Sequence, residues 1–365
     1  MAYLPLSTAN LPDPTIDPAQ GSSPADYFGI DTYTGNGGTI DSDFGFDCDL
    51  VWYKNKGRAN TYHYLFDQVR GDDLPLYSND NFSEDSQFPT YHTQSFITGG
   101  SRIVRTLGDH LNFSGDSYVA WAWKANGSGV SNTVGNIPST VSANTESGFS
   151  IVSYTGNEVD NSTVGHGLSQ TPEMIIVKSR SLVADWPVYH KDVVTTDKQY
   201  LYLNTTAGIT SAVNEFWDVA SISDTTFGLG DNPRTNNNTS TYIAYCFHSV
   251  EGYSKFGSYT GNDSPDGTFI YTGFSPALIV IKYVSGSAGG TKNWYVWDNA
   301  RSPQNVNDNI LYWNDAASEG GDSAFDIDML SNGFKLRNAE GGVNNAAQYI
   351  YVAFAEQPFK YSNAR

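Results

Sequence analysis

The stretch of sequence that decides the fold is Tyr242-Ile243-Ala244-Tyr245-Cys246-Phe247, whose aromatic and β-branched residues are typical of a buried strand. Two counterparts occur in the same chain, at Tyr118-Val119-Ala120-Trp121-Ala122-Trp123 and at Tyr351-Val352-Ala353-Phe354-Ala355-Glu356. Each strand follows the tetrapeptide Leu-Tyr-x-Asn, which occurs at 76–79, 201–204 and 311–314, at a nearly constant spacing. A second tetrapeptide, Tyr-Thr-Gly-Asn, stands further upstream at 33–36, 154–157 and 259–262. Three landmarks in the same order, three times, predict an internally repeated protein.

The segments between these landmarks also repeat. Each unit has a Gly followed by Phe or Leu (Gly45, Gly167 and Gly273), then an apolar run ending in Lys, then an aromatic strand. The runs and strands are Leu50–Lys54 with His63–Asp67, Met174–Lys178 with Trp186–His190, and Leu278–Lys282 with Trp294–Asp298. Short strands separated by Gly-, Asn-, Asp- and Ser-rich turns, in units of about 100 residues, predict an all-β fold of three tandem β-sandwich-like repeats.

These landmarks divide the chain into four segments: an extended Pro-rich N-terminal arm (1–27), a first β repeat with a linker (28–147), a second repeat (148–252) and a third (253–365). The arm's prolines disfavour a helix or a sheet ladder, and we expect it to lie against its own repeats or a neighbouring subunit. Lys124–Gly148 is the expected linker, so the first repeat is expected to sit apart. The short connection His248–Phe256 predicts that the other two pack rigidly, and strand sharing between repeats stays open.

The composition excludes several classes of protein. The 365-residue chain has 39 acidic and 20 basic residues, a net charge of −19, which argues against binding to nucleic acid or to an anionic membrane surface. We find no apolar run long enough to span a bilayer and no signal peptide, so synthesis in a cytoplasm is expected. Cys48 and Cys246 lie in strand-like sequence, and we expect two buried thiols rather than a disulfide.

Residue patterns typical of catalysis or metal binding were not found, so we expect no catalytic residues, no cofactor and no resident metal. Asp67 and Asp298 occupy equivalent repeat positions where the second repeat has His190, which favours a structural role over a pair of catalytic acids. Solvated turns are the favoured interpretation of Asp41-Ser42-Asp43 and Asp326-Ile327-Asp328, with Ca²⁺ binding as the alternative. The scattered histidines show no ligand pair: His63, His92, His110, His166, His190 and His248.

The repeated tetrapeptides are interpreted as scaffold, with the Gly of Tyr-Thr-Gly-Asn supplying a positive φ in a tight turn. Aromatic strands such as Trp294–Trp297 are expected to place one ring inward and one outward, where it could stack on a sugar or on a neighbouring subunit. The ligand-binding residues stay unknown, but a binding function would lie in the variable loops. The candidate segments are Asp80–Phe96, Ser211–Phe216, Pro233–Ser240 and Ser285–Asn293.

Several longer motifs resemble a repeated module in virion proteins of marine tailed bacteriophages. They are Tyr242–Phe247 with Val250–Asn262, Asp326–Asp328 with Leu330–Lys335, Ala353–Phe359, Trp52–Asn55, Phe66–Gly71 and Leu11–Pro14, and together they cover nearly the whole chain. The resemblance implies a phage structural protein with a tail-fibre or lectin-like sandwich fold. It supplies no catalytic residues.

We therefore expect a non-enzymatic virion structural protein on the outside of the particle, acting as a tail fibre or receptor-binding protein that adheres to host-surface glycans. The arm is expected to contact other virion proteins. The chain is also expected to form a homo-oligomer, and a trimer is the assembly considered. Because the first repeat begins soon after Met1, a capsid-decoration or head-fibre protein is the alternative. A polysaccharide-degrading tailspike is the third hypothesis.

Overall fold

The computed structural model describes residues 11–85, 91–107, 111–321 and 323–362. Nearly all regular structure within these ranges is antiparallel strand, so the expected all-β class is confirmed. Helix there is confined to short 3₁₀ turns and to α1 (Pro233–Asn236). No helix in the described ranges is long and apolar enough to cross a membrane.

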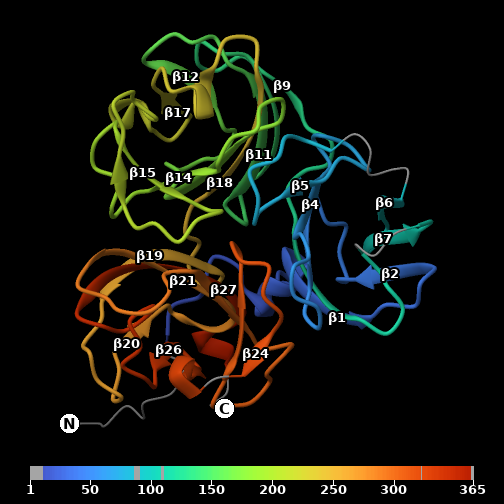
Figure 1. The fold of residues 1–365 in the computed structure, drawn as a ribbon, viewed down its shortest axis with the longest axis vertical. Helices are drawn as coiled ribbons and strands as arrows, with labels where there is room; N and C mark the ends of the chain where they lie inside the picture. The colour runs from blue at the N-terminus through green and yellow to red at the C-terminus, as the bar shows by residue number, and fades with distance from the viewer. Residues whose placement is uncertain (1–10, 86–90, 108–110, 322, 363–365) are drawn as a thin grey trace.

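Each unit consists of a larger sheet and a smaller one (Figure 1). The first unit has the strand orders β1-β8-β3-β4-β5 and β2-β7-β6, with β1 (Phe28–Thr34), β2 (Thr39–Asp43), β3 (Leu50–Asn55), β4 (Tyr64–Asp67), β5 (Leu76–Tyr77), β6 (His92–Ile97), β7 (Gly100–Arg105) and β8 (Ser117–Trp123). The second has β16-β15-β14-β13-β18-β11-β10-β9 and β12-β17, with β9 (Val130–Asn132), β10 (Ser139–Asn144), β11 (Phe149–Thr155), β12 (Ser162–Gly165), β13 (Met174–Ser179), β14 (Pro187–His190), β15 (Gln199–Tyr202), β16 (Thr210–Ser211), β17 (Thr226–Leu229) and β18 (Thr241–Phe247). The third has β19-β27-β21-β22-β23-β24 and β20-β26-β25, with β19 (Ser254–Thr260), β20 (Phe269–Tyr271), β21 (Phe274–Gly286), β22 (Trp294–Asp298), β23 (Asn309–Tyr312), β24 (Gly320–Gly321), β25 (Ile327–Leu330), β26 (Gly333–Leu336) and β27 (Ala347–Pro358).

The register of the central strands shows where the repeats correspond. Tyr33 pairs with Tyr118 and Tyr154 with Tyr242, and in the third unit Tyr259 pairs with Tyr349. The counterpart of Tyr118 is therefore Tyr349, and the sequence alignment that started this strand at Tyr351 is wrong by two residues. That alignment matched a Tyr on the same face of the strand, because side chains alternate with a period of two.

The two tetrapeptides hold loops to strands. The Asn side chain of each Leu-Tyr-x-Asn accepts a main-chain N–H at the start of the aromatic strand, at 2.9, 3.1 and 2.7 Å in the three units. In Tyr-Thr-Gly-Asn the expected positive φ is wrong: Gly35, Gly156 and Gly261 do not have it, and each lies against backbone where a Cβ would collide with a carbonyl oxygen. The Gly with positive φ is instead the one that precedes Phe or Leu, such as Gly167.

The first unit, which was expected to sit apart, lies beside the other two (Figure 1), and the three units share one hydrophobic core. Trp52, Ile176 and Val280 occupy equivalent positions on β3, β13 and β21, and all three belong to this core. Equivalent residues of β8, β18 and β27 surround a central cavity of about 20 Å³: Trp123, Phe247 and Phe354. The chain is thus a closed ring with an approximate threefold axis.

This ring explains why the central strands are buried along their whole length. On β3, Trp52 faces the shared core, whereas Val51 and Tyr53 face the core between the two sheets of the first unit. Trp294 and Trp297 divide in the same way between the shared core and the core of the third unit, and both are fully buried. The aromatic side chain that was expected to face outward therefore packs against the neighbouring unit of the same chain.

Two further expectations about the connections change. Lys124–Gly148, the expected linker, contains β9 and β10; β10 pairs with β11, and β9 pairs with β10, so both extend the sheet of the second unit. In the arm, Pro18 and Pro24 each begin a 3₁₀ turn, where the fixed φ of proline and its missing N–H cost nothing. Ile16 is buried in the shared core, and Asp13 forms an ion pair with Lys360, so residues 11–27 pack on their own chain.

Candidate functional site

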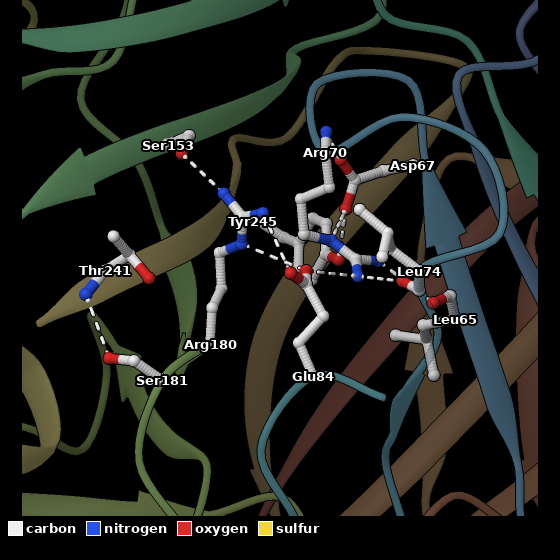
Figure 2. A network of polar contacts seen from close by, with 10 residues as sticks. All are labelled: Leu65, Asp67, Arg70, Leu74, Glu84, Ser153, Arg180, Ser181, Thr241 and Tyr245. Carbon is white, nitrogen blue, oxygen red and sulfur yellow. Dashed lines mark hydrogen bonds and ion pairs between the residues drawn. The ribbon is translucent and has the colours of Figure 1, made fainter. Parts of the chain in front are cut away.

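The joint between the first and second units is a buried polar network (Figure 2). Arg70 donates to Asp67 at 2.6 Å and to Glu84 at 3.2 Å, and both side chains of the Arg70–Asp67 pair are fully buried. From the second unit, Tyr245 donates to Asp67 at 2.8 Å and Arg180 binds both oxygens of Glu84. The carboxylate of Asp67 thereby accepts bonds from both units.

The joint between the third and first units repeats this network at equivalent positions. Arg301 donates to Asp298 at 2.6 Å and to Glu319 at 2.8 Å. From the first unit, Trp121 donates to Asp298 at 3.2 Å, and the ammonium of Lys56 lies 4.0 Å from Glu319. The two aspartates thus lie in separate units, as their repeat equivalence predicted, and each is buried at a different joint.

The joint between the second and third units has the same backbone but apolar side chains. The N–H of Ile209 donates to the carbonyl of Val284 at 2.8 Å. In the polar joints, the backbone N–H of Glu84 donates in the same way to the carbonyl of Arg180, and that of Glu319 to the carbonyl of Lys56. The arginine position holds Val193, and Val352 stands where Trp121 and Tyr245 donate to an aspartate; both valines belong to the shared core. His190 takes the aspartate position, and burial lowers its pKa to about 4, which keeps it neutral.

A lysine ends the apolar run of each unit and is fully buried at a joint: Lys54, Lys178 and Lys282. The ammonium of Lys178 donates to three carbonyls, of which that of Asn81 belongs to the first unit. That of Lys282 donates to the carbonyls of Thr205 and Lys292. Burial lowers the pKa of Lys178 and of Lys282 to about 7.

The remaining polar candidates lie in ordinary structural contacts. Asp41 pairs with Arg102 at 2.6 Å, and Asp328 lies 3.5 Å from Arg337. No group of three His, Cys, Asp or Glu side chains able to hold a metal occurs in the described part of the chain. Of the histidines, His110 lies outside the described residues and the other five are buried. Both cysteines are buried free thiols, as predicted.

The candidate loops do not converge on one site. Ser211–Phe216 ends on a buried ring that stacks on Tyr200 at 4.1 Å, and Pro233–Ser240 contains α1. Ser285–Asn293 lies at the apolar joint, where the carbonyl of Lys292 accepts from Lys282. Asp80–Phe96, of which 86–90 lie outside the described residues, contributes to a surface pocket.

This pocket, which we call the aromatic pocket, measures about 390 Å³ and is lined by aromatic rings and two carboxylates: Tyr62, Tyr64, Tyr77, Phe82, Ser83, Glu84, Asp85 and Tyr91. Tyr62, Phe82 and Tyr91 are 36%, 44% and 43% exposed, which is unusual for large rings gathered at one place. The Tyr62 ring lies 4.9 Å from that of Tyr77 and 5.9 Å from that of Phe82. The rings form the wall and floor of an open depression.

The aromatic pocket is specific to the first unit. The position before the aromatic strand holds Tyr62 in the first unit but Asp185 and Asn293 in the others, where each contacts the Asn of Leu-Tyr-x-Asn. Glu84, Ile209 and Glu319 each lie five positions after that Asn, so Phe82 corresponds to Ala207 and Ala317. The two exposed rings are therefore additions that neither the repeat nor the ring closure requires. Sequence analysis named the loop but missed Tyr62, because it stands outside the loop.

A sequence model of a family described as "Domain of unknown function (DUF7483)" matches residues 23–358. The chain belongs to this family. The match spans every strand from β1 to β27, so the family is defined over the whole three-unit ring. No curated protein and no solved structure shows significant similarity to the chain. The family description names no activity, ligand or virus.

Proposed function

We propose that the chain is a glycan-binding structural protein displayed on the exterior of a bacteriophage particle. The observation that carries the binding role is the aromatic pocket, with its exposed rings of Tyr62 and Phe82 that the other units replace by small or polar residues. Exposed rings beside fixed polar groups suit a ligand with one apolar face and several hydroxyls. A pyranose ring has that character.

The pocket also has the polar groups that such a ligand needs. Asp85 accepts a hydrogen bond of 2.6 Å from the hydroxyl of Tyr77, which holds its carboxylate beside the rings. Glu84 is held by Arg70 and Arg180, both of which belong to the buried joint. The pocket floor is thus anchored to the interface between two units, and a preorganised site loses less entropy on binding.

The phage setting is supported by the resemblance of the repeated motifs to virion modules. The net charge of −19 suits a particle surface that must not aggregate. Assembly into a homo-oligomer and attachment of the arm to other virion proteins stay predictions. A capsid-decoration role is the alternative, and labelled antibodies on intact virions would place it over the head instead of the tail. Glu84 has both oxygens occupied by arginines, which gives no support to a tailspike with two free acids.

The binding role is tested by saturation-transfer NMR of the purified chain against a panel of host-surface polysaccharides and their component sugars. Phe82→Ala removes the exposed ring and is expected to weaken binding about tenfold. Phe269→Ala is the matched control, because Phe269 on β20 is equally exposed, at 45%, but lies outside the pocket. If both variants bind as the unmodified chain does, or if no glycan in the panel binds, the aromatic pocket is not a glycan site.

A further inference from the structure

The aromatic pocket has an electrostatic character that restricts which sugar it can take. Among the described residues, its lining contains the carboxylates of Glu84 and Asp85 and no lysine or arginine. Arg70 and Arg180 direct their guanidinium groups at Glu84, and the Arg70 side chain is fully buried.

Asp85 is placed by its bond with Tyr77, whose pKa is raised by burial and by that carboxylate. A tyrosine of raised pKa stays a neutral hydroxyl, which donates to the carboxylate oxygen of Asp85. An ionised carboxylate accepts hydrogen bonds from hydroxyl and ammonium groups and repels another carboxylate. The faces of Tyr62 and Tyr91 add a second attraction for cations, since an ammonium group over a tyrosine ring is stabilised by the ring quadrupole.

Resting on the proposed glycan binding, we propose that the aromatic pocket selects pyranoses without acidic groups and binds an amine-bearing sugar most tightly. The amine is held between Asp85 and the tyrosine rings, while the apolar face of the sugar stacks on Phe82. A uronic acid of the same ring is disfavoured, because its carboxylate meets that of Asp85. The chain offers this site in the first unit, since Ala207 and Ala317 stand at the Phe82 position in the others.

The test uses three sugars that share one ring and differ in charge: glucosamine, glucose and glucuronate, with the corresponding galactose series in parallel. Competition NMR at low ionic strength and neutral pH is expected to rank them in that order, with roughly fivefold between neighbours. Asp85→Asn is expected to bring the three affinities within about twofold of each other, because its amide oxygen still accepts from Tyr77 but carries no charge. Asp266→Asn, at an exposed carboxylate of the third unit, makes the same change in net charge away from the pocket and is expected to preserve the ranking.

The outcomes separate this inference from the proposed function. Glucuronate binding as tightly as glucose or more tightly would overturn the preference, while glycan binding would stand. Equal effects of the two Asn variants would also overturn it, since the preference would then come from the net charge of the molecule. Both proposals would be overturned if no sugar of either series binds and Phe82→Ala gives the same spectrum as the unmodified chain.

Discussion

Replacing the side chains of one polar joint by those of the apolar joint tests most directly whether the three joints of the ring are equivalent. Arg70→Val alone leaves Asp67 buried without its cation, and also removes donors to Glu84 and to the carbonyl of Leu65. Removing one partner of a buried ion pair costs about 3–5 kcal/mol. Arg102→Val is the matched control, because Arg102 and Asp41 form a pair with side chains 44% and 43% exposed, for which about 0–1 kcal/mol is expected.

The exchange is completed by copying the whole joint between the second and third units. The variant carries Asp67→His, Arg70→Val, Glu84→Ile, Arg180→Val and Tyr245→Val, the residues found at the equivalent positions His190, Val193, Ile209, Val284 and Val352. Replacing an entire buried polar network by packed apolar groups is often neutral or stabilising, so the five changes together should recover most of the loss caused by one.

Urea denaturation followed by tryptophan fluorescence measures the free energy of unfolding of the three variants. The equivalence of the joints is supported if Arg70→Val is destabilised by at least about 2 kcal/mol more than Arg102→Val, and if the variant with five substitutions has a free energy of unfolding closer to that of the unmodified chain. Equal effects of the two single changes, or a variant with five substitutions that is less stable than Arg70→Val, would refute the equivalence of the three joints.

Three further predictions follow from single positions. The folded-state pKa of Lys178 and Lys282 is about 7, well below that of lysine in the unfolded chain, so above pH 7 the unfolded state binds more protons than the folded state. The free energy of unfolding should therefore rise between pH 7 and about pH 9. Lys178→Met should reduce this slope, as measured by urea titrations at each pH. Gly35→Ala forces a methyl group onto the carbonyl of Phe113 and should cost about 2 kcal/mol or more, whereas Gly38→Ala, whose nearest neighbour is 3.7 Å away, should lie within about 1 kcal/mol of the unmodified chain by the same assay. The two buried thiols, whose pKa burial raises, should react with a thiol reagent only after urea unfolds the chain, and rapid reaction in buffer would contradict their burial.

Much of the candidate site lay beyond sequence reasoning for a definable reason. The loop Asp80–Phe96 was named, because it varies between landmarks, and it does supply Phe82 and Tyr91. Tyr62 was missed, since its importance appears only when the structure places it at the position of Asp185 and Asn293. The polar joints were equally hidden, because Arg180 and Glu84 are far apart in sequence and meet only when the ring closes.

The sequence by itself determined the repeat, the central strands of each unit and the fold class, because strand periodicity and turn residues are local properties of the chain. It also indicated that Asp67 and Asp298 belong to separate units. Only the tertiary structure decided that the second face of each central strand is covered by the other units, since alternation shows that a face is apolar but not what packs on it. That closure turned an expected linker into β9 and β10, removed the expected separation of the first unit, and left the aromatic pocket open at one of three otherwise equivalent positions.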